Sequence, residues 1–231
     1  MSSNTTIKWK VAQWFELRWW KNYLRGKDKA TYLQWKRNYW QNLLGQIADI
    51  VKIENQHTIC DLGCGPAGIF IALPHNQVTA VDPLLNEYEK QLPFFDKSEY
   101  PNVTFVTSTI EDFGNSKTSE VLKTSEVYTY DVVFCLNAIN HVYDIQAGFA
   151  KLRELCATNG QVIVSIDAHN YSLFKYLFHA IPGDVLHPHQ YNLGEYKTML
   201  EEQGLAIQKT VLLKQEFIFN HYLLVAKTES K

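Results

Sequence analysis

The chain has 231 residues, of which 46% are hydrophobic and 20% charged, and its formal net charge is −2. This length and composition are typical of a soluble globular protein with one α/β domain, and no stretch approaches the roughly 18 apolar residues of a membrane-spanning helix. The four cysteines lack C-x-x-C spacing, and the first residues lack the apolar core of a signal peptide. We therefore expect a cytoplasmic protein without a disulfide framework.

The first forty residues differ in kind from the rest of the chain. They carry nine Lys or Arg against two acidic residues, a net charge of 9 − 2 = +7, whereas the remainder carries 13 basic and 22 acidic residues, a net charge of 13 − 22 = −9. All six tryptophans also lie there. Helical spacing of apolar residues predicts helices over residues 7–25 and 31–51, so we expect a helical cap over residues 1–52.

This cap has four interpretations. In the first, which we favour, the cap is a lid that closes over a cofactor and builds the acceptor pocket. In the second, it is a surface for an anionic membrane, since Trp and Tyr with Lys and Arg are typical of membrane interfaces. In the third, it is a surface that binds nucleic acid, with basic side chains contacting phosphates and aromatic rings stacking on bases. The fourth interpretation is plain core packing of the tryptophans.

From residue 53 to residue 231 the pattern predicts a single α/β domain. Short apolar strands alternate with helices, which indicates βαβ units and a parallel sheet covered on both faces. Strands are expected at 57–62, 77–82, 102–108, 130–137 and 160–167, and helical segments at 67–73, 87–92 and 144–156.

The end of the chain follows a different pattern. A helix over 194–203 stops at Gly204, a residue typical of helix C-termini. Two strand-like runs, 206–213 and 216–226, follow with only two residues between them. So short a connection cannot cross over a sheet, so we expect an antiparallel hairpin.

Two connections are long. Residues 113–129 contain two near-identical copies of KTSEV, at 117–121 and 123–127, which we interpret as a surface loop or helical extension. Residues 168–193 follow the fifth strand, where open α/β sheets bind ligands, and are rich in histidine and aromatic residues. The candidate substrate-binding residues here are His169, His187, His189 and Tyr191. The H-P-H spacing of 187–189 suits a turn better than a zinc site, so we expect no metal.

The stretch CDLGCGPAG, residues 60–68, follows the first strand. Its glycines spell G-x-G-x-x-G, the dinucleotide-binding pattern. However, Asp61 stands two residues before the first glycine, and a carboxylate there would repel a diphosphate but suit an ammonium or sulfonium group. Asp82 ends the next strand, where an acid binds ribose hydroxyls in either class of cofactor. Asp61 therefore favours a phosphate-free adenosine cofactor over NAD.

With these features the sequence resembles the class I S-adenosylmethionine-dependent methyltransferases. DLGCGPAG, TAVDP, STIEDF, YDVVFCLNAINHV and NGQVIVSID resemble five of their motifs in order, over residues 55–227. The loop departs from the usual pattern by having Ala67-Gly68 where the family has a single glycine at position 67. The resemblance implies a Rossmann-like, doubly wound, seven-stranded, mostly parallel sheet with an antiparallel C-terminal hairpin.

The resemblance also implies a role for particular residues. Asp61 would face the methionine amino group, the glycine loop would let the backbone pass close to the cofactor, and Asp82 would bind the ribose. Glu111 or Asp112 would accept from the adenine amine, with Ile110 beside the ring, and Asn137 would lie near the reacting methyl group. The implied cofactor-binding residues are Asp61, Gly63, Cys64, Gly65, Asp82, Pro83, Ile110, Glu111, Asp112 and Asn137.

Methyl transfer is an in-line displacement in which positioning supplies much of the rate, and a base is needed only for a hydroxyl or protonated amine. His141, just after the fourth strand, is the candidate base. We therefore expect a methyltransferase that uses S-adenosylmethionine, yields S-adenosylhomocysteine, and acts on a small-molecule or lipid-like acceptor. The alternatives are a methyltransferase acting on tRNA or another nucleic acid, an NAD-binding oxidoreductase and a non-catalytic binding module.

Overall fold

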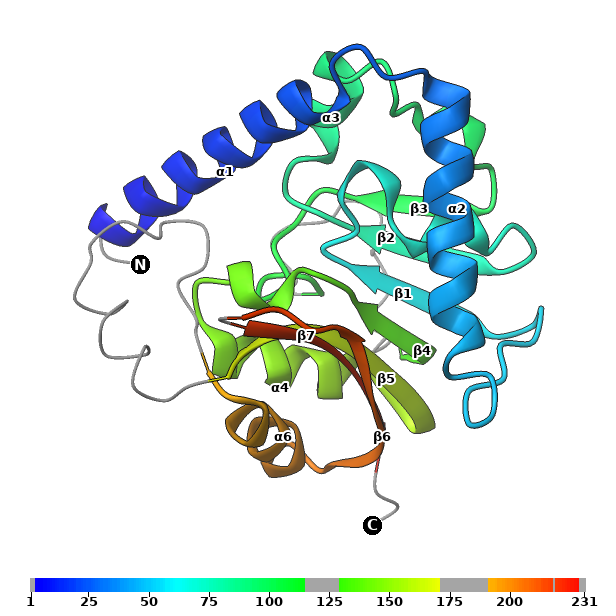
Figure 1. The fold of residues 1–231 in the computed structure, drawn as a ribbon, viewed down its shortest axis with the longest axis vertical. Coiled ribbons are helices and arrows are strands. Elements are labelled where there is room, and N and C mark those ends of the chain that lie inside the picture. Colours follow the sequence, from blue (N-terminus) through cyan, green and yellow to red (C-terminus); the bar gives the residue numbers. More distant parts are fainter. Residues whose placement is uncertain (1–2, 115–128, 171–190, 218, 229–231) are drawn as a thin grey trace.

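The computed structural model describes residues 3–114, 129–170, 191–217 and 219–228. Its centre is a seven-stranded sheet in the order β3-β2-β1-β4-β5-β7-β6 (Figure 1). The strands are β1 Thr58–Leu62, β2 Gln77–Val81, β3 Val103–Val106, β4 Tyr130–Cys135, β5 Cys156–His169, β6 Leu205–Lys214 and β7 Phe219–Thr228. The α-helices are α1 Ser3–Leu24, α2 Lys29–Gly45, α3 Leu85–Gln91, α4 Ile145–Leu155 and α6 Leu193–Glu202.

Strand direction confirms both parts of the expected topology. The pairs β1–β2, β2–β3, β1–β4 and β4–β5 are parallel, whereas β7 is antiparallel to both β5 and β6. The chain leaves β6 at Lys214 and re-enters the sheet at Phe219, so the connection is too short for a crossover. β7 therefore fills the space between β5 and β6.

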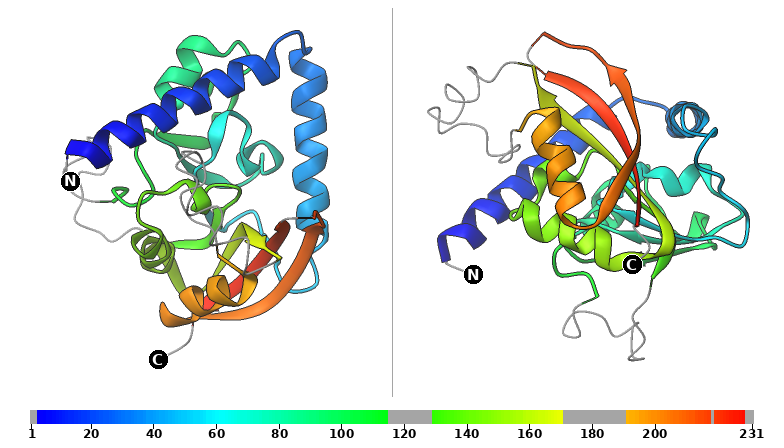
Figure 2. Two further views of the ribbon diagram at one scale, coloured as in Figure 1. Left: turned by 60° about the vertical axis from the view of Figure 1, so that its left-hand side comes forward. Right: turned by 90° about the horizontal axis from the view of Figure 1, so that it is seen from below.

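Successive side chains of the central strands point to opposite faces of the sheet, so one hydrophobic core forms on each face. Ile59 and Phe134 belong to the core that contains residues of α2 and α3, whereas Cys60 and Val133 belong to the core that contains residues of α4 and α6. Because both faces of the parallel strands are covered, β4 is a nearly continuous apolar run and β1 carries apolar residues on both faces. Figure 2 shows the helices on the two sides of the twisted sheet.

The helical segment expected at 67–73 is not an α-helix. The structure has two 3₁₀ turns there, Gly65–Ala67 and Ile69–Ala72, joined through an extended Gly68 with φ −69° and ψ −175°. A Cβ at Gly68 would lie 2.3 Å from Asp61 Oδ2, so the chain passes too close to Asp61 for a larger residue. Too few residues remain before Pro74 for regular α-helical turns, and α2 packs against this segment instead.

α2 begins and ends earlier than the pattern predicted. Asp28 is its N-cap and accepts hydrogen bonds at 2.8 Å from both the backbone N–H and the hydroxyl of Thr31. The helix ends at Gly45, and residues 46–50 form turns. Trp40 and Leu43 are buried in the same core as the sheet, and Trp40 Nε1 donates to the carbonyl of Ala67 at 3.0 Å. Plain core packing therefore explains Trp40.

α1 has a different environment. It meets α2 at a bend near Gly26, whose φ is +74°, and it extends away as a separate arm (Figures 1 and 2). Trp20 and Tyr23 pack against the core, whereas Trp14 and Trp19 are 54% and 51% exposed. One face of α1 therefore lies toward the domain and the other is open to solvent.

The duplicated KTSEV copies lie outside the described residues, as do His187 and His189 of the long connection after β5. Among the described residues, no helix is long and apolar enough to span a bilayer.

Candidate functional site

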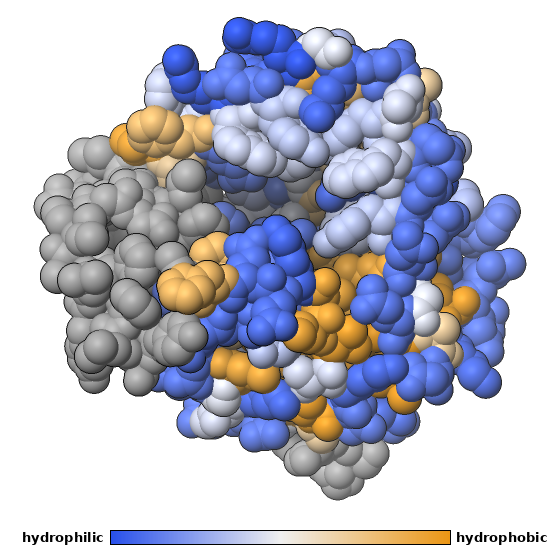
Figure 3. Space-filling view, viewed as in Figure 1, coloured by the Kyte–Doolittle hydropathy of each residue, from blue (hydrophilic) through white to orange (hydrophobic). Residues whose placement is uncertain are grey.

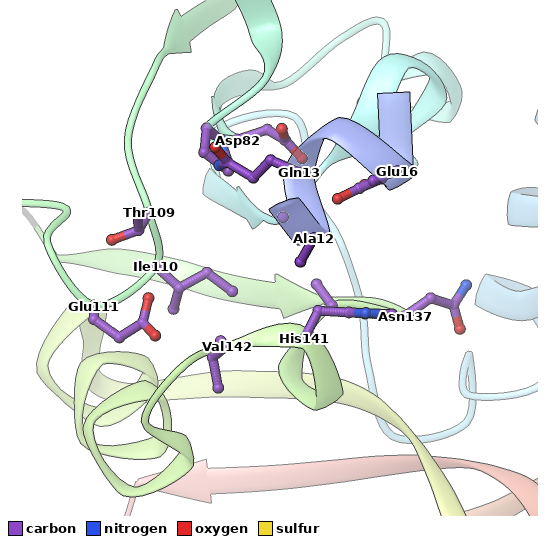
Figure 4. A pocket seen from close by; sticks show the side chains of 13 residues that line it. Ala12, Gln13, Glu16, Asp82, Thr109, Ile110, Glu111, Asn137, His141 and Val142 are labelled. Atoms are coloured by element: carbon purple, nitrogen blue, oxygen red, sulfur yellow. The ribbon is translucent and has the colours of Figure 1, made fainter. Parts of the chain in front are cut away.

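The loops that follow β1, β2, β3 and β4 meet at one edge of the sheet, where the carboxyl ends of the parallel strands lie. They line a cavity of about 100 Å³, here called the first cavity, together with residues of α1 (Figure 4). Its lining residues are Ala12, Gln13, Glu16, Gly63, Asp82, Pro83, Thr109, Ile110, Glu111, Asn137, Ala138, His141 and Val142. In the space-filling view a hollow opens beneath α1 and beside α2 (Figure 3). The cavity therefore lies at the topological switch between β1 and β4.

At Gly63 the wall of the first cavity consists of backbone atoms only. Its φ is +68°, and a Cβ there would lie 2.3 Å from the Cβ of Ala138. The N–H of Gly63 donates to the carbonyl of Val81 at 2.7 Å, which ties the loop to the end of β2. Only glycine therefore fits this position, and a ligand in the cavity can approach the backbone closely.

Asp82 is the acid at the end of β2 and is 5% exposed. One of its carboxylate oxygens accepts from the N–H of Gly65 at 3.0 Å and the other from that of Leu84 at 2.8 Å. Burial, together with the like charge of Glu16, raises the pKa of Asp82 to about 7, against the effect of these two hydrogen bonds. A carboxylate oxygen has more than one lone pair, so Asp82 can also accept from ligand hydroxyls.

Asp61 lies behind the glycine loop and does not line the first cavity. It is 1% exposed and accepts hydrogen bonds from the backbone N–H groups of Ile69 and Phe70, and its Oδ2 has no hydrogen-bond partner in the part of the chain that the structure describes. Burial raises the pKa of Asp61 to about 7, opposed by those bonds and by the charge of Lys36. In this structure Asp61 holds the 3₁₀ turn in place.

The loop after β3 supplies a second acid. Glu111 Oε1 accepts from the N–H of Tyr143 at 2.9 Å, and burial raises the pKa of Glu111. Ile110 and Glu111 line the first cavity, on the opposite side from Gln13 and Asp82 (Figure 4). Asp112 instead hydrogen bonds to the hydroxyl of Thr109 at 3.1 Å and does not line the cavity. Of the two acids proposed for adenine, Glu111 is therefore the one at the site.

Asn137 follows β4 in an unusual backbone conformation, with φ +55°. Its N–H donates to Ser165 Oγ at 2.7 Å, and the Ser165 hydroxyl donates back to Asn137 Oδ1 at 3.0 Å. Non-glycine residues rarely adopt such φ values, and Asn is among those that tolerate them. The reciprocal bonds to β5 hold Asn137 at the mouth of the cavity.

A second cavity, of about 540 Å³, adjoins the first. Its lining comes from α2, the ends of β4 and β5, and the β6–β7 hairpin. The lining residues are Tyr39, Asn42, Leu43, Gln46, Asn137, Asn140, His141, Ser165, Asp167, Leu213, Lys214 and His221. Asn137 and His141 line both cavities, so they form a wall that the two share.

The structure therefore brings together only part of the residues that the sequence suggested. Those that line the first cavity are Gly63, Asp82, Pro83, Ile110, Glu111, Asn137 and His141; those that do not are Asp61, Cys64, Gly65 and Asp112. Cys64 is buried in the core, and Gly65 contributes its N–H to Asp82.

Of the proposed substrate residues, His169 and Tyr191 line neither cavity, and the N–H of His169 donates to the carbonyl of Tyr191 at 3.0 Å. Several lining residues were not expected from the sequence. Asp167 could have been identified from the sequence, because it is an acid at the end of the strand expected at 160–167. No local pattern marked Glu16, Gln46 or His221. Within the described ranges, no cluster of three or more His, Cys, Asp or Glu side chains is arranged to hold a metal ion.

Comparison with known proteins indicates the class of protein to which the chain belongs. Residues 32–210 match a family model described as a methyltransferase domain. A ubiquinone biosynthesis O-methyltransferase of Rickettsia prowazekii (strain Madrid E) is 31% identical over 140 residues, which cover 60% of this chain and 48% of that protein. The protein of the same description from Rickettsia bellii (strain OSU 85-389) is 28% identical over 159 residues, covering 63% of this chain and 61% of its own. The chain thus spans about half the length of the first of these relatives.

Solved structures show the same fold at low identity. Magnesium protoporphyrin IX methyltransferase from Synechocystis PCC 6803 with bound SAM has a TM-score of 0.61 at 17% identity, covering 99% of both chains. The 1,6-didemethyltoxoflavin-N1-methyltransferase of Burkholderia thailandensis has a TM-score of 0.60 at 12% identity, covering 96% of this chain and 90% of its own. At these identities the likeness concerns the fold alone.

The strand order, the glycine loop and the strand-end acid define a Rossmann-like fold with the sheet of a methyltransferase. Because the family model matches well over half of the chain, the chain belongs to the methyltransferase-domain family. The resemblance to class I S-adenosylmethionine-dependent methyltransferases is thereby confirmed.

Proposed function

We propose that this protein transfers a methyl group from S-adenosylmethionine to a small polar acceptor. The observation that carries the proposal is the wall formed by Asn137 and His141, which two cavities share. The first cavity has the strand-end residues suited to an adenosine ligand, and the second lies on the other side of that wall. A donor in the first and an acceptor in the second would meet at Asn137.

The residues of the first cavity fit the cofactor. The bare backbone at Gly63 admits close approach, Asp82 would accept from the ribose hydroxyls, and Ile110 with Glu111 would lie against the adenine. When bound, S-adenosylmethionine supplies a methyl group on a positively charged sulfur. NAD fits less well, because Asp82 and Glu16 place two acids in a cavity that would have to accept a diphosphate.

α1 would act as the lid. Ligand pockets usually measure about 300–1,000 Å³, and the first cavity, at about 100 Å³, is much smaller while Ala12, Gln13 and Glu16 of α1 form part of its wall. Cofactor entry would therefore require α1 to move outward. Of the cap proposed over residues 1–52, α2 would be the fixed part, since Trp40 and Leu43 are buried in the domain core, and α1 the moving part.

The chain's own contribution to the reaction would be positioning. Asn137 would hold the reacting end of the cofactor, and closure of α1 would exclude water from the first cavity. His141 would contact the acceptor at the shared wall and take up its proton where the acceptor is a hydroxyl or a protonated amine. Tyr39 on α2 and Gln46 just after its end would fix the acceptor.

The lining of the second cavity favours a polar acceptor. All of its lining residues except Leu43 and Leu213 carry a polar or charged group, so a polar acceptor would find several hydrogen-bond partners there. The relatives described as ubiquinone biosynthesis O-methyltransferases act on oxygen by their description, and we propose oxygen methylation here by analogy. Four free, buried cysteines suit a reducing compartment, so we propose a cytoplasmic location.

The test is a transfer assay with labelled S-adenosylmethionine against pools of polar metabolites, lipids and tRNA, after mass spectrometry of any ligand that co-purifies. We expect S-adenosylhomocysteine to bind and label to appear in the polar metabolite pool. Label in tRNA or lipid alone would contradict the acceptor class. Binding of NAD without binding of S-adenosylhomocysteine would contradict the proposed function as a whole.

A further inference from the structure

Asp167 and His221 form a pair of interacting side chains at one end of the second cavity. They are directly opposite each other in the antiparallel register of β5 and β7. Asp167 Oδ1 and His221 Nδ1 are in contact, and the side chains are 33% and 28% exposed. Both residues line the cavity, and the second carboxylate oxygen of Asp167, Oδ2, is not the one that contacts His221.

The pair stands at a defined distance from the wall that the two cavities share. Ser165, which holds Asn137 by two hydrogen bonds, lies two residues before Asp167 on the same face of β5. Two residues of a strand advance by about 6.6 Å. Asp167 therefore lies about that distance along β5 from the residue that holds Asn137.

The surroundings hold this end of the cavity in place. Asn140, which is 5% exposed, donates through Nδ2 to the hydroxyl of Tyr196 at 2.9 Å and to the backbone carbonyl of Asp167 at 3.3 Å. On the outer side, Glu216 Oε2 lies 3.9 Å from His221 Nε2 and does not line the cavity. The Asp167–His221 pair is therefore built into the sheet.

We propose that this pair recognises a second polar group on the acceptor, a hydroxyl separate from the group that is methylated. The ionised carboxylate of Asp167 can accept a hydrogen bond from a hydroxyl, and its contact with His221 Nδ1 holds it in position for that bond. The same carboxylate opposes an anionic substituent at this position. This inference rests on the proposed function, because it assumes that methyl transfer occurs at Asn137.

The experiment compares hydroquinone with phenol, which differ only in the second hydroxyl. Isothermal titration into the S-adenosylhomocysteine complex of the full chain should show hydroquinone binding about 10- to 100-fold more tightly, the scale of hydrogen bonds to charged groups. In Asp167→Asn and His221→Leu the preference should fall toward one. In Glu216→Gln, which alters a carboxylate beside His221 but outside the cavity, it should persist. Each variant should still bind S-adenosylhomocysteine, which reports correct folding.

A second measurement does not depend on variants. Hydroquinone, but not phenol, should shift the imidazole resonances of His221 in the NMR spectrum of the wild-type complex. Equal binding of the two phenols overturns the inference, as does a preference that survives both substitutions. Binding of neither phenol to a complex that does hold S-adenosylhomocysteine also overturns it. If S-adenosylhomocysteine itself does not bind, the proposed function fails instead.

Discussion

Glu16 on α1 and Asp82 at the end of β2 are like-charged neighbours in the wall of the first cavity. The charge of Glu16 helps burial raise the pKa of Asp82, and burial raises the pKa of Glu16 itself. The hydroxyl of Tyr88 donates to Glu16 Oε1 at 3.1 Å and so holds this carboxyl in place. An ionised Asp82 therefore opposes the position of α1 over the cavity, which connects cofactor binding to movement of the helix.

Cofactor affinity should therefore depend on pH. The pKa of Asp82 is raised to about 7, so below that pH the group is protonated and is a poorer acceptor for ribose hydroxyls. Affinity for S-adenosylhomocysteine should rise as pH increases through about 7 and then level off. Glu16→Gln removes the like charge, so the midpoint should move to lower pH. Isothermal titration over a pH series on both sides of that midpoint measures the shift.

The matched control is Glu201→Gln, an exposed acid on α6, which should leave the midpoint unchanged. A flat pH profile in the wild type, or an identical profile in Glu16→Gln, would show that the Asp82 charge does not govern binding.

Removal of the Asp82 carboxylate should weaken cofactor binding. Asp82→Ala should cost roughly 1.5–3 kcal/mol of S-adenosylhomocysteine binding, the scale of hydrogen bonds to a charged group. Asp96→Ala is the control, because Asp96 also accepts from a backbone N–H, that of Ser98, but lines neither cavity. Calorimetric Kd values for the wild type and both variants make the comparison, and equal losses in the two variants would argue against a ribose contact.

Gly63 should tolerate no side chain. Gly63→Ala places a Cβ 2.3 Å from that of Ala138 and adds the strain of a positive φ, so both stability and cofactor affinity should fall. Gly204→Ala has nearly the same φ, +72°, with no atom near its Cβ, so it isolates the backbone cost. We expect Gly63→Ala to melt at a clearly lower temperature than Gly204→Ala. Equal melting temperatures would mean that the contact with Ala138 relaxes freely.

Deletion of residues 1–22 tests the lid. The deletion keeps the buried Leu24 and the Asp28 cap of α2, so a folded domain should remain. Methyl transfer should be lost, because water then enters the first cavity and the cofactor is no longer enclosed. In the intact protein, tryptophan fluorescence should change when S-adenosylhomocysteine binds, since Trp20 lies beside Gly65.

Other outcomes of the deletion support the other interpretations of the N-terminal helices. Aggregation of the shortened protein would indicate that α1 serves core packing alone. The shortened protein could instead keep methyl transfer but lose a salt-sensitive binding to anionic vesicles or to tRNA. That result would indicate that the exposed residues Trp14, Phe15 and Trp19 bind a membrane or a nucleic acid.

The features that the sequence predicted correctly are those whose cause is local. The glycine loop directly follows β1, and Asp82 stands at the end of the short apolar strand β2, so each follows from neighbouring residues. The hairpin of β6 and β7 follows from a connection too short to cross the sheet. Together these signals sufficed to predict the fold and one edge of the site.

The features that only the tertiary structure decided depend on segments far apart in the chain. Glu16 reaches the cavity because α1 bends back at Gly26, and His221 meets Asp167 because β7 inserts beside β5. Residues 67–73 form 3₁₀ turns because Asp61 crowds Gly68 and α2 already covers that face. Periodicity reports the face that each segment buries, but it carries no information about which distant segment will cover that face.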